Sequence, residues 1–444
     1  MECTIEIRPH DRERGSAEMP EKLLASLRIS NGGHFALRFG GKTVDVKVKA
    51  AAGEDAILLL SREYFGSLML SDPPTRMKVI FHEGMLHLGP VIAVLTETGK
   101  NGPSENIQAF SEELHRFVEK EGGCLYVAGL NASPGTGYRF TGTSWLKGNV
   151  PAPDIVYNRL HARQTEKSRL FQQKTADWKE KGIDVFNSNY LTKWEVYECL
   201  KANPLLQAFL PATFRYEASL LSEKLDEFGE LYVKPENGSQ GRGIIRLAKT
   251  KSGFLLEHNL KEDGVPIILQ NMDEAAMKAE ALIGRRPYMI QQGIPLVSPG
   301  GRKTDFRFLA FKSGAADWHI ISAVARIAAE SAMVSNLSQG GLAVKPLPLL
   351  LSNFGNKKGT FVWGLMHELA AAAAKTIDAN ADGHFAELGI DIGADRNGKP
   401  WIIEANIKPS KSAFGPARGI RPSVKALYHY CLFLWTERRT SHAG

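Results

Sequence analysis

Near its C-terminal end the chain reads Asp391-Ile-Gly-Ala-Asp-Arg-Asn-Gly-Lys-Pro-Trp-Ile-Ile-Glu404-Ala-Asn406, which predicts two β-strands joined by a turn. The turn is the Asp-Arg-Asn-Gly segment, because Asn-Gly supplies the backbone conformations that a tight hairpin needs. Glu404 and Asn406 share one face of an extended strand, and a hairpin brings Asp391 back opposite them. Two carboxylates and an amide oxygen are hard ligands that suit Mg²⁺, so the hairpin predicts a magnesium site. The alternative is an ordinary solvated edge with acidic residues.

Length and composition limit the class of protein. The 444 residues exceed what one hydrophobic core usually serves, so we expect two or three domains. The formal charge of +7 is a mild basic bias without a Lys/Arg block or an RNA-binding aromatic motif, so we expect no nucleic-acid partner. No stretch has the apolar length of a membrane span, and the charged N-terminus lacks a secretion signal. We therefore expect a cytoplasmic protein with no membrane partner.

The pattern along the chain predicts three domains. Short alternating stretches between Gly, Asp and Pro turns predict a small β-rich domain over residues 1–90. An apolar run at residues 88–95 is typical of a strand buried on both faces. It opens a region of mixed helices and strands at residues 91–183, which we expect to be an α/β domain. A third domain of strands and helices follows over residues 184–440. We find no internal repeat.

A second chemical signal is Lys234-Pro-Glu-Asn-Gly238-Ser239-Gln-Gly241-Arg-Gly243, a glycine-rich loop directly after a predicted strand. Glycines let backbone N–H groups approach an anion closely, and Lys234 leaves the strand where its ammonium group reaches the same phosphates. The spacing differs from both the dinucleotide fingerprint and the Walker A pattern. A flexible hairpin turn is the alternative.

Arginines lie between these two signals. In Asp305-Phe-Arg307, alternation puts the two charged side chains on one face of a strand, and the next strand adds Arg326. Guanidinium groups bind phosphate or carboxylate oxygens in a fork, whereas a simple surface ion pair is the alternative. The following loop, Ser-Asn336-Leu-Ser-Gln-Gly-Gly, either closes over a ligand or is only a connection.

Taken in order, these segments resemble the ATP-grasp superfamily, and more closely the YheC/YheD family associated with bacterial endospore coats. The resemblance rests on the ordered set Lys-Pro-x-x-Gly-Ser-x-Gly-x-Gly, Gln-Gln-Gly-Ile, Asp-x-Arg, Ser-Asn-Leu-x-x-Gly-Gly, Gly-Ile-Asp and Glu-x-Asn, over roughly residues 184–417. It implies an α+β ATP-grasp domain, in which two α+β subdomains clamp ATP. An α/β pre-ATP-grasp region and the small N-terminal β domain would precede it.

The resemblance also implies a role for each matching residue. Arg307 and Arg326 would be catalytic and neutralise phosphate or acyl-phosphate oxygens, while Asp391, Glu404 and Asn406 would hold one or two Mg²⁺ ions. Many superfamily members have Glu at the position of Gln292, so the backbone of the next two residues is the expected contact for adenine. The residues implied in ATP binding are Lys193, Lys234, Ser239, Gly241, Gly243, Gln291, Gln292, Gly293, Ile294, Asp305 and Asn336.

The implied chemistry is carboxylate activation. A substrate carboxylate attacks the γ-phosphate of ATP, and an amine or thiol displaces phosphate from the resulting acyl phosphate. The expected cofactors are ATP and Mg²⁺, and the expected substrates are a small carboxylate and an amine of amino-acid or peptide type, in a process linked to sporulation. The alternative is a spore coat-associated structural or binding protein that uses the fold without turnover, with coat components as partners. Intact metal ligands and phosphate lysines favour the ligase, since a structural role gives no reason to hold like charges together.

Overall fold

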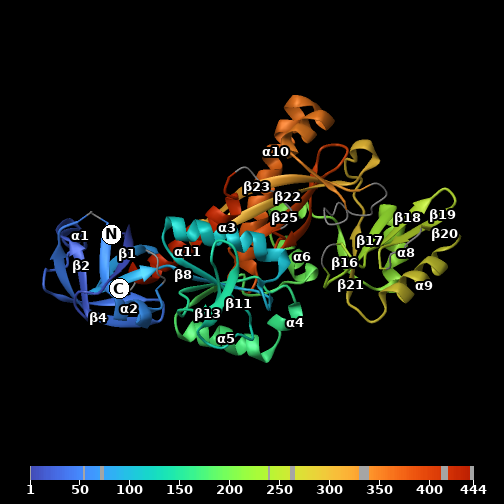
Figure 1. The fold of residues 1–444 in the computed structure, drawn as a ribbon. Helices are drawn as coiled ribbons and strands as arrows, with labels where there is room; N and C mark the ends of the chain where they lie inside the picture. The colour runs from blue at the N-terminus through green and yellow to red at the C-terminus, as the bar shows by residue number, and fades with distance from the viewer. Residues whose placement is uncertain are drawn as a thin grey trace. The chain divides into compact units, whose positions relative to one another are not determined.

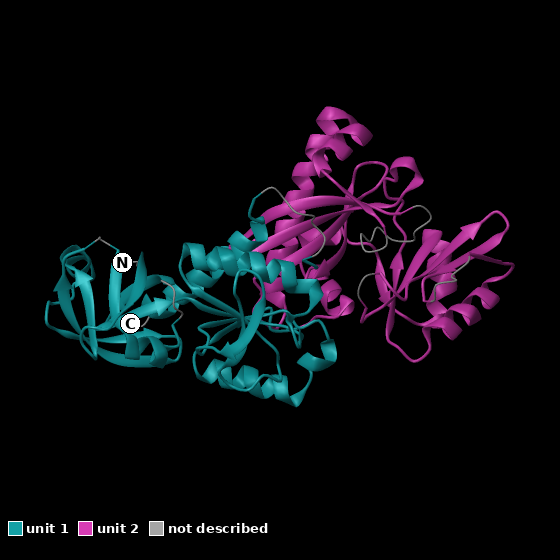
Figure 2. Ribbon diagram, viewed as in Figure 1, with its two compact units in different colours: residues 1–189, 313–315, 410–444 teal, residues 190–312, 316–409 magenta. Residues whose placement is uncertain are grey.

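The chain folds into two compact units, and unit 1 is assembled from segments that are distant in sequence (Figure 2). The computed structural model describes residues 2–53, 56–70, 75–238, 241–260, 266–329, 340–411 and 419–440. Unit 1 comprises residues 1–189, 313–315 and 410–444, and unit 2 comprises residues 190–312 and 316–409. The division into three domains stays a prediction. In the described part of the chain, no helix has the length and apolar character needed to cross a membrane.

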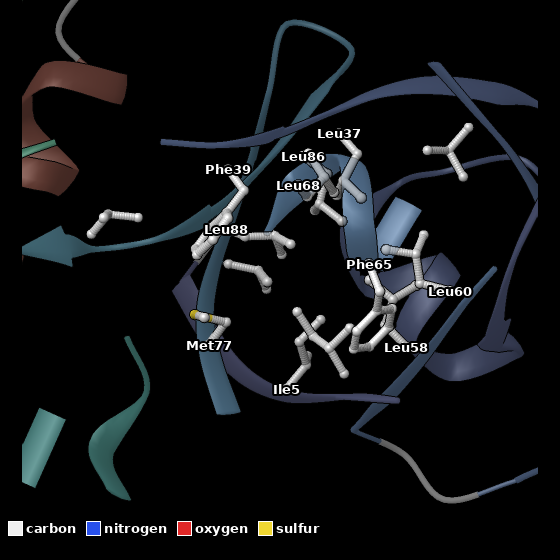
Figure 3. Packing of buried hydrophobic residues seen from close by; sticks show 14 of the residues in the cluster. Ile5, Leu37, Phe39, Leu58, Leu60, Phe65, Leu68, Met77, Leu86 and Leu88 are labelled. Carbon is white, nitrogen blue, oxygen red and sulfur yellow. The ribbon is translucent and has the colours of Figure 1, made fainter. Parts of the chain in front are cut away.

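The N-terminal part of unit 1 is a closed β-barrel (Figure 1). Its elements are β1 (Glu2–His10), β2 (Ser16–Pro20), α1 (Glu21–Leu27), β3 (His34–Phe39), β4 (Lys42–Ala51), β5 (Ile57–Ser61), α2 (Arg62–Leu68), β6 (Thr75–His82) and β7 (Met85–Gly89). The strands close in the order β1-β5-β2-β4-β3-β7-β6. Alternate side chains of these strands point inward and fill the barrel with Leu, Ile, Phe and Met, as Figure 3 shows.

The barrel contains a structural repeat that the sequence does not reveal. A strand, a short helix and a hairpin occur twice, as β2-α1-β3-β4 and as β5-α2-β6-β7. Both helices have seven residues and end in Ser-Leu followed by a residue in the left-handed region, Arg28 (φ 58°) and Met69 (φ 60°). Outside these helix ends the two copies share few residue identities, so what repeats is the backbone structure and not the sequence.

The second part of unit 1 is a mixed sheet with helices. Its elements are β8 (Val91–Leu95), β9 (Thr98–Gly99), β10 (Gly102–Pro103), α3 (Glu105–Glu121), β11 (Cys124–Ala128), β12 (Thr136–Phe140), β13 (Trp145–Asn149), β14 (Ile155–Asn158), α4 (Arg163–Glu166), α5 (Arg169–Glu180), β15 (Asp184–Phe186) and α11 (Pro422–Thr440). The strand order is β13-β12-β11-β8-β14-β15, and the last four strands in this order are parallel. The apolar run at residues 88–95 is not one strand, because Pro90 has no N–H for a ladder and separates β7 from β8.

The C-terminal helix α11 belongs to unit 1, although it follows unit 2 in the chain. Tyr428 donates a hydrogen bond from its hydroxyl to the Gly122 carbonyl oxygen at 2.8 Å. Trp435 is 1% exposed and packs so closely on Gly89 that a Cβ there would lie 2.7 Å from the indole Nε1. Arg439 forms a buried ion pair with Asp154 just before β14. These contacts make α11 part of the core of unit 1.

Unit 2 contains two antiparallel sheets with helices. Its elements are α6 (Lys193–Lys201), α7 (Pro204–Gln207), β16 (Thr213–Arg215), α8 (Ala218–Phe228), β17 (Glu230–Pro235), β18 (Ile245–Thr250), β19 (Gly253–His258), β20 (Ile267–Leu269), α9 (Met272–Ile283), β21 (Tyr288–Gln292), η1 (Pro299–Gly301), β22 (Thr304–Lys312), β23 (Trp318–Ile327), β24 (Leu342–Val344), α10 (Pro346–Asn380), β25 (Glu387–Ala394) and β26 (Pro400–Asn406). One sheet has the order β16-β21-β17-β18-β19-β20 and packs on α8 and α9, and the other has the order β24-β23-β22-β25-β26 and packs on α10 (Figure 1).

The predicted hairpin near the C-terminal end is confirmed as β25 and β26. Its turn is closed by a hydrogen bond from the Gly398 N–H to the Asp395 carbonyl oxygen at 2.9 Å, and Gly398 has a φ of 76° that favours glycine. All residues of β25 are buried, and Ile390, Ile392 and Ile402 pack into the core beneath α10. The apolar face of the hairpin is thus fixed by the core, which leaves the opposite face for polar side chains.

Candidate functional site

The predicted metal ligands lie together on the polar face of the β25–β26 hairpin. Asp391 is the register partner of Glu404, and Asn406 is the partner of Gly389, two residues before Asp391. With its amide oriented to satisfy both atoms, Asn406 donates to Glu404 Oε1 at 3.2 Å and accepts from Arg307 Nη2 at 3.2 Å. Within the described ranges no three His, Cys, Asp or Glu side chains form a metal-binding group. Two carboxylates and one amide oxygen remain a donor set that fits Mg²⁺ together with phosphate oxygens.

The two predicted catalytic arginines contact the same carboxylate. Arg307 forms a bidentate ion pair with Asp391, with Nη2 and Oδ2 2.7 Å apart. Arg326 Nη2 lies 2.9 Å from Asp391 Oδ2, while its Nε lies 2.6 Å from Asp305 Oδ1. Burial opposes the charge on Asp391, but the two guanidinium groups outweigh it and lower the pKa of this carboxyl to about 2. The site therefore holds a fixed negative charge between fixed positive charges.

The two predicted phosphate lysines come from different elements of unit 2 and approach the hairpin. Lys193 is the first residue of α6, whose capping box joins Thr192 and Glu195, and its ammonium forms an ion pair with Glu404. Lys234 on β17 donates to the Gln291 side-chain oxygen at 2.5 Å. Burial lowers the pKa of Lys234 to about 8, and the charges of Lys193 and Lys303 act in the same direction.

These groups line one pocket. Lys193, Lys234, Gln291 and Glu404 contribute polar groups to its lining. Its other walls are mostly apolar and come from α6, the segment after α7, β21 and β26: Val196, Tyr197, Leu200, Leu210, Pro211, Met289, Ile402, Ile403 and Ala405. A mostly apolar pocket that is also lined by two lysines suits a ligand with a flat ring and a polyanionic tail.

The strand predicted to contact adenine is tied to its neighbours. The Gln292 side-chain oxygen accepts the Ala212 N–H at 3.2 Å, so it is already engaged. Gly293 donates its N–H to the Glu230 carbonyl oxygen at 2.8 Å, and a Cβ at Gly293 would lie 2.6 Å from Glu230 Cγ. Glycine is therefore needed there, and the Gly293 N–H is not available to a base. Within the described residues the Ile294 N–H donates to no backbone acceptor outside the strand ladders, so the contact predicted for Ile294 stays a prediction.

The glycine-rich loop joins β17 and β18. Gly241 and Gly243 have φ values of 69° and 79°, so both need the freedom of glycine. The Asn259 amide holds this part of the loop by donating to the Gly241 carbonyl oxygen and accepting the Ile244 N–H at 2.8 Å. Two predicted ATP contacts, Ser239 and Asn336, lie outside the described residues. Their roles stay predictions.

Two residues of the site have no motif and were not predicted. Lys303 donates from its ammonium to the Tyr232 hydroxyl at 2.6 Å and lies 5.0 Å from the centroid of that ring. Lys234 approaches the same ring at 5.5 Å. Burial lowers the pKa of Lys303 as it does that of Lys234. Alternation was the available signal, because Lys303 stands two residues before Asp305 and Tyr232 two residues before Lys234.

Comparison with known proteins gives a family and several relatives. A family model described as YheC/D like ATP-grasp matches residues 182–434. The chain is 29% identical over 398 residues to endospore coat-associated protein YheD of Bacillus subtilis (strain 168), covering 87% of each chain. It is 20% identical over 281 residues to endospore coat-associated protein YheC of the same organism, covering 62% of this chain and 76% of that protein. Among solved structures, D-cycloserine synthetase DcsG matches with 13% identity and a TM-score of 0.46, covering 77% of this chain and 99% of that one.

The family match confirms the α+β ATP-grasp fold class predicted from the sequence. The matched region contains Lys193 and the whole series from Lys234 to Asn406 that carried the resemblance. Because this model covers more than half of the chain, the protein belongs to the YheC/D-like ATP-grasp family.

Proposed function

We propose that the protein is an ATP- and Mg²⁺-dependent ligase that activates a carboxylate as an acyl phosphate for attack by an amine. The observation that carries this proposal is the gathering of Lys193, Lys234, Arg307 and Arg326 around the Asp391–Glu404 pair. Phosphoryl transfer depends on positioning and charge neutralisation and needs no protein nucleophile. Cations beside a hard-donor set supply both.

The residues divide the work as follows. The apolar walls of the pocket hold the base, and Lys193, Lys234 and Lys303 bind the phosphate oxygens. A substrate carboxylate oxygen then attacks the γ-phosphorus as ADP leaves, and Arg307 and Arg326 neutralise the acyl phosphate that forms. Attack of an amine at the acyl carbon forms the amide and releases phosphate. Asp391, Glu404 and Asn406 would hold Mg²⁺, which supplies Lewis-acid charge neutralisation when bound.

The substrates that fit this scheme are a small carboxylate and an amine of amino-acid or peptide type. A cytoplasmic location and an association with spores extend the proposal, because both relatives are named endospore coat-associated proteins. The same names favour a second candidate function. In that case the protein binds Mg-ATP and coat components without turnover.

The test is ADP release by the purified protein with ATP, Mg²⁺ and a panel of amino acids and dipeptides. We expect ADP and phosphate to appear in equal amounts with at least one pair of substrates. Glu404→Gln should slow this release by about a hundredfold or more, because it removes a metal ligand. Glu368→Gln, an exposed change on α10, should leave the rate unchanged. Nucleotide binding without ADP release for any member of the panel would replace the ligase with the binding protein.

A further inference from the structure

The carboxylates of the proposed metal site already have cationic partners. Asp391 is held by Arg307 and Arg326, and Glu404 is held by Lys193. Asp391 is buried, so it cannot lose these partners to water without a large cost. A divalent cation that binds Asp391 and Glu404 therefore has to replace side-chain cations.

The charge of the surroundings makes that replacement unfavourable for a metal ion alone. Five side-chain cations and three carboxylates surround the site: Lys193, Lys234, Lys303, Arg307, Arg326, Asp305, Asp391 and Glu404. One strand further away, Arg246 is neutralised by Glu230 and Glu257, at 2.8 and 2.7 Å. The whole group remains positive with these residues included. Such a site attracts a polyphosphate and repels a free divalent cation.

Two of the cations have the means to move. Arg326 is shared between two carboxylates, so it can release Asp391 while its Nε stays bonded to Asp305 at 2.6 Å. Lys193 has a flexible four-carbon stem and lines the same pocket as Lys234, which places both ammonium groups within one ligand site. A polyphosphate in that pocket offers a new anionic partner to Lys193, which lines it. It also lies beside Lys234, on which the charge of Asp391, the partner of Arg326, acts.

We infer that Lys193 and Arg326 are exchangeable counter-ions that make metal binding conditional on a bound polyphosphate. They occupy Asp391 and Glu404 until phosphate oxygens draw them away, and only then do the two carboxylates accept a divalent cation. If the side-chain cations moved to phosphate without a metal ion, the carboxylates would be left unpaired. If the metal ion bound without phosphate, the displaced side-chain cations would be left unpaired. Neither step is favourable alone, because the site is poorly solvated. By linkage the metal in turn tightens nucleotide binding by the same factor. This inference rests on the proposed function, because it takes the same site to bind ATP and Mg²⁺.

The test uses Mn²⁺ as the probe and needs no nucleotide. Electron paramagnetic resonance of free Mn²⁺ should show weak binding to the full-length wild-type protein. Lys193→Met removes the counter-ion of Glu404 and keeps the length of the side chain, so it should tighten Mn²⁺ binding by at least about tenfold. Arg326→Gln should show a gain in the same direction. The double variant Lys193→Met/Glu404→Gln should lose the gain, which would show that Mn²⁺ binds at Glu404.

The matched control is Lys201→Met, an exposed lysine at the end of the same helix α6, which should leave Mn²⁺ binding as in the wild type. The inference is overturned if the wild type binds Mn²⁺ as tightly as Lys193→Met, or if neither variant gains. A separate measurement, equilibrium dialysis of ATP against the wild type with Mg²⁺ present, tests the proposed function. Absence of ATP binding there would defeat the ligase proposal, whereas the Mn²⁺ comparison would still decide the inference.

Discussion

Lys234 is a partly buried lysine whose side-chain hydrogen-bond partner carries no charge. Its ammonium donates to the neutral Gln291 amide, while Lys193 and Lys303 add positive charge nearby. Burial lowers its pKa to about 8, within reach of ordinary assay conditions. The charge that this residue offers to a phosphate therefore depends on pH.

We expect nucleotide affinity to fall as the pH rises through about 8. Below that pH Lys234 is charged and binds phosphate, and above it the free protein loses this cation, so affinity should drop about tenfold between pH 7 and pH 9. Dissociation constants measured across this range at constant ionic strength provide the check. Lys234→Arg keeps a charge at every pH used and should give a flat profile. A flat profile in the wild type would show that Lys234 does not contact the nucleotide.

Single residues of the site were partly predictable. Alternation placed Asp305 with Arg307, and Glu404 with Asn406, on common faces, and the strands confirm both. The ion-pair partners were not predictable. Asp305 on β22 pairs with Arg326 on the neighbouring strand β23, and Arg307 pairs with Asp391 on the other neighbour, β25. These partners follow from the strand order β23-β22-β25, which no local pattern contains. Lys303 escaped notice for a related reason, since its partner Tyr232 is 71 residues away in the chain.

Helix α6 couples stability to the site, because its first residue is Lys193. The capping box fixes this end: the Thr192 hydroxyl accepts the Glu195 N–H at 3.1 Å, and the Glu195 side chain accepts the Thr192 N–H at 2.6 Å. The Lys193 N–H also donates to the Glu236 carbonyl oxygen at 3.0 Å. The position of the Lys193 ammonium thus depends on an intact helix start.

Thr192→Ala should therefore lower both the free energy of unfolding, by about 1 kcal/mol, and the affinity for nucleotide. The matched control is Asn271→Ala at the start of α9, where the Asn271 side chain accepts the Glu274 N–H at 2.8 Å. It should cost about the same stability and leave nucleotide affinity unchanged. Urea unfolding and a nucleotide titration of both variants make the comparison. Equal affinities in the two variants would contradict a role for the α6 cap in the site.

Elements with a strong local pattern were predictable and the others were not. Helix α3 spans residues 105–121, where the apolar positions repeat with helical spacing that is visible in the sequence. The hairpin at β25 and β26 was found from its Asn-Gly turn. The strand expected at residues 88–95 is confirmed only over Val91–Leu95, which is the buried strand β8. The run is longer than the strand because hydrophobicity is continuous where the backbone changes from barrel to sheet at Pro90. A hydrophobic run predicts that its residues are buried, but it does not predict in which of two cores they lie.

The whole molecule depends on a helix that closes unit 1 from the far end of the chain. Trp435 on α11 fills the space over Gly89, and Tyr428 bonds to Gly122. We expect Trp435→Ala to lower the free energy of unfolding of unit 1 by about 3 to 5 kcal/mol, because it opens a cavity in a core where the indole is buried. Hydrogen exchange followed by mass spectrometry should show lost protection in β8 and α3.

The control for this prediction is Phe361→Ala on α10, where the ring is 69% exposed and its loss should change stability little. In Trp435→Ala the strands of unit 2 should keep their protection when nucleotide is present, since the ligand stabilises the unit that binds it. Equal loss of protection in both units would show that they unfold together. It would contradict the expectation that each unit has its own free energy of unfolding.

Because unit 1 is discontinuous in sequence, it can be completed only after unit 2 has been synthesised. A ribosome makes the barrel and the first sheet, then all of unit 2, and only afterwards α11. At about 5 to 20 residues per second, unit 2 alone takes roughly ten to fifty seconds to emerge, and unit 1 lacks its closing helix throughout. A chain released early would expose Gly89 and the apolar side chains that α11 covers, and proteases or chaperones recognise such surfaces. Helix α11 thereby distinguishes chains that extend beyond residue 440 from chains interrupted before it.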